Sequence, residues 1–343
     1  MNDLADSSGS VRMPPPSAVR RAWARVLAQA GRIPEKETEV ARRGFTVKRP
    51  PAVTRLEEIG RQFVWGYNVA VGSAELAGLT EQLEGQAPEN AGFAYEGAAM
   101  GLAIADWLTP GRRMLDAYIG GPAGHHEYMA WVGLGWALAR LPVRPERALA
   151  RYRNLHCWLA LDGYGFHEGY FHWRHRILAQ RRPKGLSAGG LHVFDQGLGR
   201  SLWFVCGADA GAVARAVTSF DPERHADLWA GVGLAAAYAG GCDEADLAAL
   251  MSLGSAHAGS LAQGVVFAAQ ARIRAGNWVP HLEVACIRLL GMDPVSSAAV
   301  AVAAKPDGHS LADYQRWRFM VQRMCLEQAP RLRSAGRCSD VTS

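Results

Sequence analysis

Apolar residues recur along most of the chain at steps of three and four positions, which is the spacing of one face of an α-helix. In the first such stretch these residues are Leu56, Ile59, Phe63 and Tyr67. The same spacing occurs in residues 98–108, 128–141, 154–161, 197–205, 228–239, 263–274 and 314–326. Alternation with period two, typical of half-buried strands, is nearly absent, and clusters of Gly and Pro separate the periodic stretches. The pattern therefore predicts an all-α protein built of helical hairpins.

Three short motifs occur twice in the same order, about 95–100 residues apart. The first set is Glu96-Gly97, Trp131-Val132-Gly133-Leu134-Gly135 and Glu168-Gly169; the second is Gln196-Gly197, Trp229-Ala230-Gly231-Val232-Gly233 and Gln263-Gly264. We expect an internal duplication with repeats at about 90–190 and 191–290, followed by a C-terminal helical cap. Tandem helical units stack because neither buries its apolar face alone. The prediction is an α/α solenoid or toroid.

The domain organisation follows from composition and charge. We expect a flexible basic tail over residues 1–36, a single helical domain over 37–330 and a flexible tail over 331–343. The first 50 residues hold ten Lys/Arg and five Asp/Glu, so the net charge of +5 lies there and the body is neutral. The body therefore lacks the basic excess that nucleic-acid binding needs. No run approaches the length of a membrane span, and no secretory signal begins the chain, so we expect a cytoplasmic protein.

The repeated motifs single out two carboxylates. The first repeat has Glu where the second has Gln, and only a carboxylate holds a charge or a proton. Any chemistry is therefore expected at Glu96 and Glu168. Glu96 is equally well explained as complementing a helix dipole or as a buried acid with a raised pKa, paired with Glu168. The glycines that follow the Glu and Gln residues are expected at close helix contacts.

Histidines are concentrated between positions 125 and 192. If the chain is helical from Glu168 onward, Glu168, His172 and His175 share one face and could bind a first-row metal or act as an acid–base relay beside His167. The alternative is that these groups bond to one another in a wet helix seam. We expect no cofactor, with a metal at Glu168, His172 and His175 as the less favoured possibility.

Arg200 lies in an otherwise apolar stretch and needs a carboxylate partner, for which Asp195, Glu96 and Glu168 are candidates. Aromatic residues are concentrated near these polar positions, which favours a groove for a lipid-like, polyene or polycyclic ligand. The expected catalytic residues are Glu96, His167, Glu168, His172 and Arg200. The expected substrate-binding residues are Tyr95, Tyr164, Phe166, Asp195, Gln196 and Trp203.

Five longer blocks of the sequence resemble a known family. They are EVARRGF at 39–45, GYN at 66–68, GFAYEGAAM at 92–100, LDGYGFHEGYF at 161–171 and FDQGLGRSLW at 194–203. They resemble the bacterial domain-of-unknown-function family numbered 1702, whose members accompany enediyne polyketide synthases in actinomycete antibiotic clusters. The resemblance covers about residues 37–325. It implies a role in maturing the enediyne core from a polyene and supplies no catalytic residues.

Two hypotheses of function follow. In the first, the protein is a cofactor-independent enzyme or a cyclisation chaperone that acts on a polyketide-derived polyene in an apolar cavity. In the second, it is a non-catalytic helical scaffold that docks other proteins of the enediyne cassette. An internal cavity bordered by the carboxylates favours the first hypothesis, and a solid core with an exposed apolar face favours the second.

Overall fold

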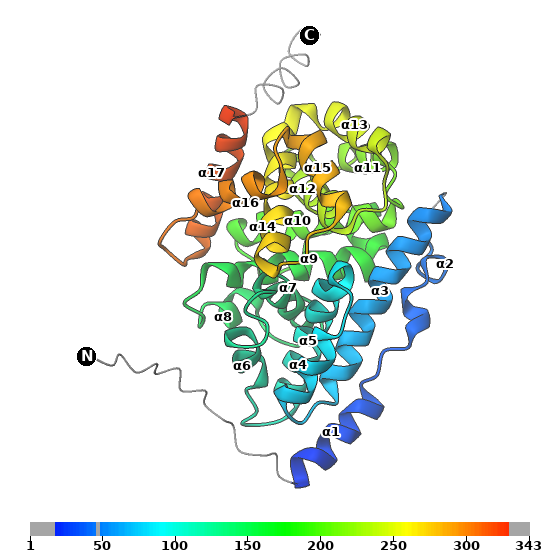
Figure 1. Ribbon diagram of the computed structural model, residues 1–343, viewed down its shortest axis with the longest axis vertical. Coiled ribbons are helices and arrows are strands. Elements are labelled where there is room, and N and C mark those ends of the chain that lie inside the picture. Colours follow the sequence, from blue (N-terminus) through cyan, green and yellow to red (C-terminus); the bar gives the residue numbers. More distant parts are fainter. Residues whose placement is uncertain (1–17, 46–48, 329–343) are drawn as a thin grey trace, which may run out of the picture.

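The computed structural model describes residues 18–45 and 49–328, and every regular element in these ranges is helical (Figure 1). The longer helices are α1 (Ala18–Ala30), α3 (Pro50–Val71), α4 (Leu76–Glu84), α5 (Pro88–Leu108), α7 (Glu127–Leu138), α9 (Leu159–Phe171), α10 (Ala188–Val205), α11 (Ala210–Thr218), α12 (Pro222–Ala239), α13 (Glu244–Leu253), α14 (Ala258–Ala275), α15 (Pro280–Leu290), α16 (Pro294–Ala303) and α17 (Leu311–Gln328). The shorter ones are η1 (Glu35–Thr38), α2 (Val40–Arg43), α6 (Met114–Gly120), α8 (Pro145–Leu149), η2 (Leu155–Trp158), η3 (Arg174–Leu178) and η4 (Ser255–His257). The predicted all-α class is confirmed.

Local sequence signals set many helix boundaries. Proline occupies the first turn of α3, α5, α12, α15 and α16, where its missing N–H is not needed. Asp243 and Asp246 form a capping box at the start of α13. Gly276 and Gly291 end α14 and α15 with φ angles of 64° and 72°, which glycine adopts without strain.

The long helices pack in chain order. Helix α3 lies against α5, and the series continues through α7, α9, α10 and α12 to α14. In Figure 1 the colours pass in the same order from the blue α3 through the green α9 and α10 to the yellow and orange α14 and α16. The last helix, α17, packs on α14 and also contacts α10 and η2. Each long helix of the series α5 to α12 is therefore covered on both sides by its neighbours along the chain.

Glycines set the distance between these helices. A Cβ atom on Gly163 of α9 would lie 2.0 Å from the carbonyl oxygen of Val132 in α7, and one on Gly165 would lie 2.0 Å from that of Phe194 in α10. Residues i and i+2 of a helix point in nearly opposite directions, about 200° apart. The two glycines of a G-x-G motif therefore face the two neighbouring helices. The same pattern recurs at Gly133 and Gly135 in α7, Gly197 and Gly199 in α10, and Gly231 and Gly233 in α12. The expected close helix contacts at these glycines are confirmed.

The glycine contacts also define which positions are equivalent between helices. Gly97 approaches the carbonyl oxygen of Phe63 in the preceding long helix, and Gly197 likewise approaches its preceding helix. Gly264 approaches the carbonyl oxygen of Ala230 in α12, which again precedes it. In α9 the glycine with this preceding-helix contact is Gly163.

One predicted equivalence is therefore wrong. Gly169 lies against Ser201 of α10, the following helix, so its contact differs in direction from that of Gly264. Glu168 is accordingly not the counterpart of Gln263, whose counterpart in α9 is the residue before Gly163, Asp162. The dipeptides are alike, but their places in the helix packing are not. The division of the chain into two repeats of about 95–100 residues stays a prediction.

Helix α1 occupies part of the segment predicted as a flexible tail. Ala24 and Leu27 are buried, and the hydroxyl of Tyr67 donates a hydrogen bond of 3.0 Å to the carbonyl oxygen of Gly31. This part of the chain therefore packs against α3, through an apolar face too short to stand out in the sequence. The predicted tail residues 1–17 and 331–343 lie outside the described residues.

No single helix within residues 18–45 and 49–328 has both the length and the apolar character to cross a membrane. Helices α15 and α16 reach that length and apolar character only when they are counted together, and the chain bends by 67° between them.

Candidate functional site

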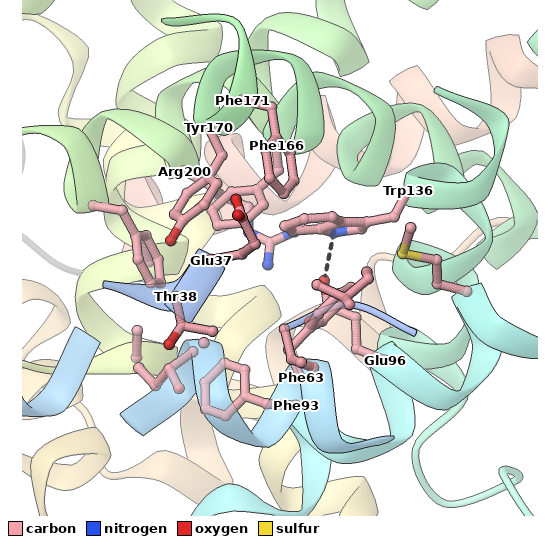
Figure 2. Close-up of a pocket in the computed structure, with 18 of the residues that line it drawn as sticks. Glu37, Thr38, Phe63, Phe93, Glu96, Trp136, Phe166, Tyr170, Phe171 and Arg200 are labelled. Carbon is pink, nitrogen blue, oxygen red and sulfur yellow. Dashed lines mark hydrogen bonds between the residues drawn. The ribbon is translucent and has the colours of Figure 1, made fainter. Parts of the chain in front are cut away.

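A narrow internal cavity lies between α3, α5, α7, α9, α10 and α12, with residues from Ile33 to Thr38 along one wall (Figure 2). Its empty volume is about 760 Å³ when the solvent at its mouth is included. Eight of the 21 lining residues are aromatic: Phe63, Phe93, Trp136, Phe166, Tyr170, Phe171, Phe204 and Tyr238. The acidic and basic side chains on it are Glu37, Glu96, Arg140 and Arg200. Such a lining suits a mainly apolar ligand with few polar groups.

Glu96 brings a carboxyl group to this wall from the middle of α5, and its residue is only 2% exposed. The indole N–H of Trp136 donates a hydrogen bond of 2.9 Å to its Oε1 (Figure 2). Burial raises the pKa of Glu96 from 4.5 to about 7, although Arg200 and the Trp136 N–H act in the opposite direction. Near neutral pH the protonated and ionised forms are therefore both populated, as general acid–base catalysis requires. This agrees with the prediction of a buried acid with a raised pKa, but the predicted pairing with Glu168 across the cavity is wrong, because Glu168 does not line the cavity.

Arg200 reaches the same cavity from α10. Its Nη1 forms an ion pair with Oδ1 of Asp162, and its guanidinium lies 5.0 Å from the ring centre of Phe166. The expectation that Arg200 has a carboxylate partner is correct, but the partner is Asp162 and not Glu96, Glu168 or Asp195. Asp162 occupies this place because it has the same position before a glycine in α9 as Glu96 has in α5.

A second, smaller cavity with an empty volume of about 320 Å³ shares Arg200, Leu234 and Tyr238 with the first and also contacts Asp162. The ion pair between Arg200 and Asp162 therefore borders both spaces. Apart from this pair and the tyrosine hydroxyls, the lining of the smaller cavity is apolar.

Amide side chains hold Asp162 in place. Gln196 donates a hydrogen bond of 2.7 Å from Nε2 to Oδ2 of Asp162. In turn, Oε1 of Gln196 accepts bonds of 3.1 Å from Gln263 and 3.0 Å from Nε of Arg318. The Gln residues of the repeated motifs thus form a buried chain that ends on the carboxylate beside Arg200, and both carboxylate oxygens of Asp162 are satisfied.

His167, Glu168 and His172 form a separate cluster next to the cavity rather than on its lining. Arg140, which does line the cavity, donates a hydrogen bond of 3.2 Å from Nε to Nε2 of His167. Glu168 accepts a bond of 2.7 Å from Nε of Arg176, and His172 is exposed. Burial lowers the pKa of His167, and the pKa of Glu168 also lies below its ordinary value because hydrogen bonds from His167 and Arg176 outweigh its burial. The predicted pairing of Glu168 with Arg200 is therefore wrong.

The same cluster bears on metal binding. One ligand atom each from His167, Glu168 and His172 lies within 4.8 Å of the others. The bond from Arg140 to Nε2 places the ring proton of His167 on Nδ1, the atom that faces Glu168 at 3.5 Å. A metal needs a lone pair there, so the hydrogen bonds from Arg140 to His167 and from Arg176 to Glu168 fit this cluster better than a metal does.

His175 does not join this cluster. The predicted steps of four and three assume an unbroken helix after Glu168, but α9 ends at Phe171 and the π-helical turn η3 begins at Arg174. The side chain of His175 is therefore turned out of the predicted register.

Of the predicted substrate-binding residues, Phe166 lines the cavity. Tyr95 does not, since its ring stacks on that of His126 with centres 4.0 Å apart. Tyr164 packs against Phe194 with ring centres 5.5 Å apart. Each of these tyrosines lies about 100° or 200° around its helix from the cavity-facing residue, so closeness in sequence did not bring it to the cavity.

The remaining predicted residues have structural partners away from the cavity lining. Asp195 accepts bonds of 2.9 and 2.6 Å from Arg224, and Gln196 belongs to the amide chain described above. Trp203 donates its indole N–H to the carbonyl oxygen of Gly240 at 2.8 Å. These contacts stabilise the packing of α10 on α12 and on the segment that follows it.

Several cavity residues were not found from the sequence: Glu37, Trp136, Arg140, Asp162 and Tyr238. A helix-by-helix alignment on the glycines would have found Asp162, because it precedes Gly163 as Glu96 precedes Gly97. Arg140 and Glu37 lie beside helix ends and short turns, where no periodic signal marks them.

The fold and the cavity define an all-helical protein with an internal apolar site that contains a buried acid and a buried arginine. The chain belongs to the DUF1702 family of proteins of unknown function, whose family model matches residues 22–325. The family suspected from the sequence blocks is thereby confirmed. No curated protein and no solved structure matches the chain significantly.

Proposed function

We propose that this protein is an accessory protein of enediyne antibiotic biosynthesis, which binds a polyketide-derived polyene in the apolar cavity and promotes core maturation by acid–base chemistry at Glu96. The observation that carries the proposal is the buried carboxyl of Glu96, with a pKa of about 7, in a mainly apolar cavity that eight aromatic side chains line. The enediyne context comes from the resemblance of the five sequence blocks.

The chemistry needs no redox partner. Protonated Glu96 gives its proton to one carbon of the polyene, whose π electrons form the new C–H bond, and the resulting cation is attacked by another double bond. Loss of a proton from a neighbouring carbon then restores neutrality and reprotonates Glu96. The Trp136 N–H and the nearby Arg200 stabilise the carboxylate in between. The aromatic rings exclude water, and the negative π surface of an aromatic ring attracts a cation.

The scaffold hypothesis remains the alternative, with other proteins of the enediyne cassette as partners. It requires neither the cavity nor proton transfer at Glu96. In either case the site of action proposed here is the cytoplasm, where the polyketide synthase works.

Metabolite profiling of an enediyne producer that lacks this gene tests the proposal. The strain is complemented with wild-type protein, with Glu96→Gln or with Glu168→Gln. We expect Glu96→Gln to be soluble and folded but to support at least about 10²-fold less product, the usual minimum weight of a general acid or base. Glu168→Gln is the matched control, because it removes a buried carboxylate that lies outside the cavity lining.

Full production with Glu96→Gln would refute the catalytic role and favour the scaffold. Equal loss with both variants would show that removal of any buried carboxylate in this region is harmful, and would equally refute the specific role of Glu96.

A further inference from the structure

Arg200 has donors that the protein does not use. Its residue is 5% exposed, and Nη1 is bound to Asp162. Neither Nε nor Nη2 has a hydrogen-bond partner among the described residues, and Nε is fully buried. A buried donor without an acceptor costs free energy, and the cost is larger when the donor belongs to a charged group. A ligand that brought an oxygen to these atoms would recover that cost.

Glu96 is incompletely bonded on the same cavity. Trp136 bonds to its Oε1, whereas Oε2 has no hydrogen-bond partner among the described residues. Arg200 and Glu96 influence each other's charge but do not form an ion pair, so they border the cavity with space between their ends. Figure 2 shows both side chains directed toward the interior from opposite walls.

The charges around the cavity leave a positive excess. Glu37 is neutralised by Arg42 and Arg43, which lie outside the lining. Asp162 offsets only one of the two cavity arginines, Arg140 and Arg200. With Glu96 protonated, the charge left without a counter-charge on the lining is that of Arg140, while Arg200 offers unused hydrogen-bond donors beside Asp162.

We infer that the ligand of this cavity is a long apolar chain that ends in a carboxylate, and that Arg200 binds this carboxylate through Nε and Nη2. These two donors lie side by side on the guanidinium, which is the arrangement that matches the two oxygens of a carboxylate. Oε2 of Glu96, on the facing wall, stays free for proton transfer to the chain. The inference rests on the proposed function, because it takes the cavity to be a polyene-binding site and names the end group that positions the chain.

The test compares three fluorescent polyenes that differ in their end group. cis-Parinaric acid carries a carboxylate, its methyl ester carries a neutral carbonyl, and diphenylhexatriene carries no oxygen. Each is titrated into the full-length protein near pH 6.5 at fixed ionic strength, and fluorescence gives the dissociation constant. For wild-type protein we expect the acid to bind at least about tenfold more tightly than the ester, because a charge-assisted pair is lost with the ester.

The matching variants remove a buried ion pair as a whole, which avoids an unpaired buried charge. Arg200→Met with Asp162→Leu removes the cavity pair. Arg224→Met with Asp195→Leu removes a pair of the same type outside the lining. We expect the first double variant to bind acid and ester equally and the second to keep the wild-type preference. Arg200→Lys, which keeps the charge but loses the paired donors, is expected to keep only part of the preference and serves if the first double variant does not fold.

Each outcome separates the inference from the proposed function. Failure of all three polyenes to bind wild-type protein would refute the polyene-binding function itself. Binding of all three with no preference for the acid would overturn the inference and leave the apolar site in place. A preference that survives in both Arg200→Lys and the cavity double variant would assign the carboxylate to another residue and would also overturn it.

Discussion

The raised pKa of Glu96 makes a prediction about stability that is independent of any ligand. The carboxyl ionises at about pH 7 in the folded protein and at about 4.5 in the unfolded chain. As the pH rises through this interval, the unfolded chain gives up its proton first, so the wild-type protein loses stability. At about 1.4 kcal/mol for each factor of ten, the full loss is about 3 kcal/mol.

The substitution Glu96→Gln removes this titration while keeping the shape of the side chain and an oxygen that can accept the Trp136 N–H. Urea unfolding of both proteins, followed by circular dichroism at pH 5 and pH 8.5, measures the effect. We expect the stability of the variant relative to wild type to rise by about 2–3 kcal/mol between these pH values. Other titrating groups are common to both proteins and cancel in the difference.

Glu168→Gln is again the control. The pKa of Glu168 lies below its ordinary value, so the carboxyl is ionised in the folded protein and mostly ionised in the unfolded chain over this pH range. Its stability difference from wild type should therefore stay constant between pH 5 and pH 8.5. If the Glu96→Gln difference is also constant, within about 0.5 kcal/mol, the reasoning from burial to a raised pKa is refuted.

The remaining predictions concern other parts of the structure. Asp162→Leu alone should lower the free energy of unfolding by about 3–5 kcal/mol, because it leaves Arg200 buried and unpaired, and a loss under 1 kcal/mol in urea unfolding would contradict this. Gly163→Ala should yield misfolded or insoluble protein, since its Cβ would lie 2.0 Å from a carbonyl oxygen, whereas Gly78→Ala, which meets no atom within 4 Å, should fold normally. Elemental analysis of dialysed protein should find no stoichiometric zinc or iron, and one metal ion per chain that disappears with Glu168→Ala would refute the hydrogen-bonded assignment of that cluster.

The helical class could be predicted because apolar spacing depends on each helix alone. Three residues of the cavity were also found from the sequence: Glu96 from the repeated Glu-Gly and Gln-Gly motifs, Arg200 as a charged residue in an apolar stretch, and Phe166 from the aromatic residues near these polar positions. The partner of Arg200 was missed because a pairing between helices depends on how they are aligned. The dipeptides Glu168-Gly169 and Gln263-Gly264 look equivalent, but only the contact of each glycine shows which helix it faces.

The predicted metal set was wrong at His175 for a different reason. Its assignment needed the helix to continue past Phe171, where the chain instead forms a π-helical turn. Neither glycine nor proline marks this irregularity in the sequence. Residues such as Arg140, which enter the cavity from beyond a helix end, could not be predicted from the sequence because no periodic pattern extends to them.

The glycine contacts between helices also determine how the shape of the cavity can vary. Because the backbones touch at Gly163 and Gly165, and at the matching pairs in the neighbouring helices, the helix axes cannot move closer, and sliding along one another would lose these contacts. The outline of the cavity is then determined by the size of individual side chains rather than by movement of the helices relative to one another. If the cavity binds a chain as proposed, substitution of Phe63 or Phe166 would change the bulk that it accepts on an unchanged backbone, and ligand choice would change without refolding of the protein.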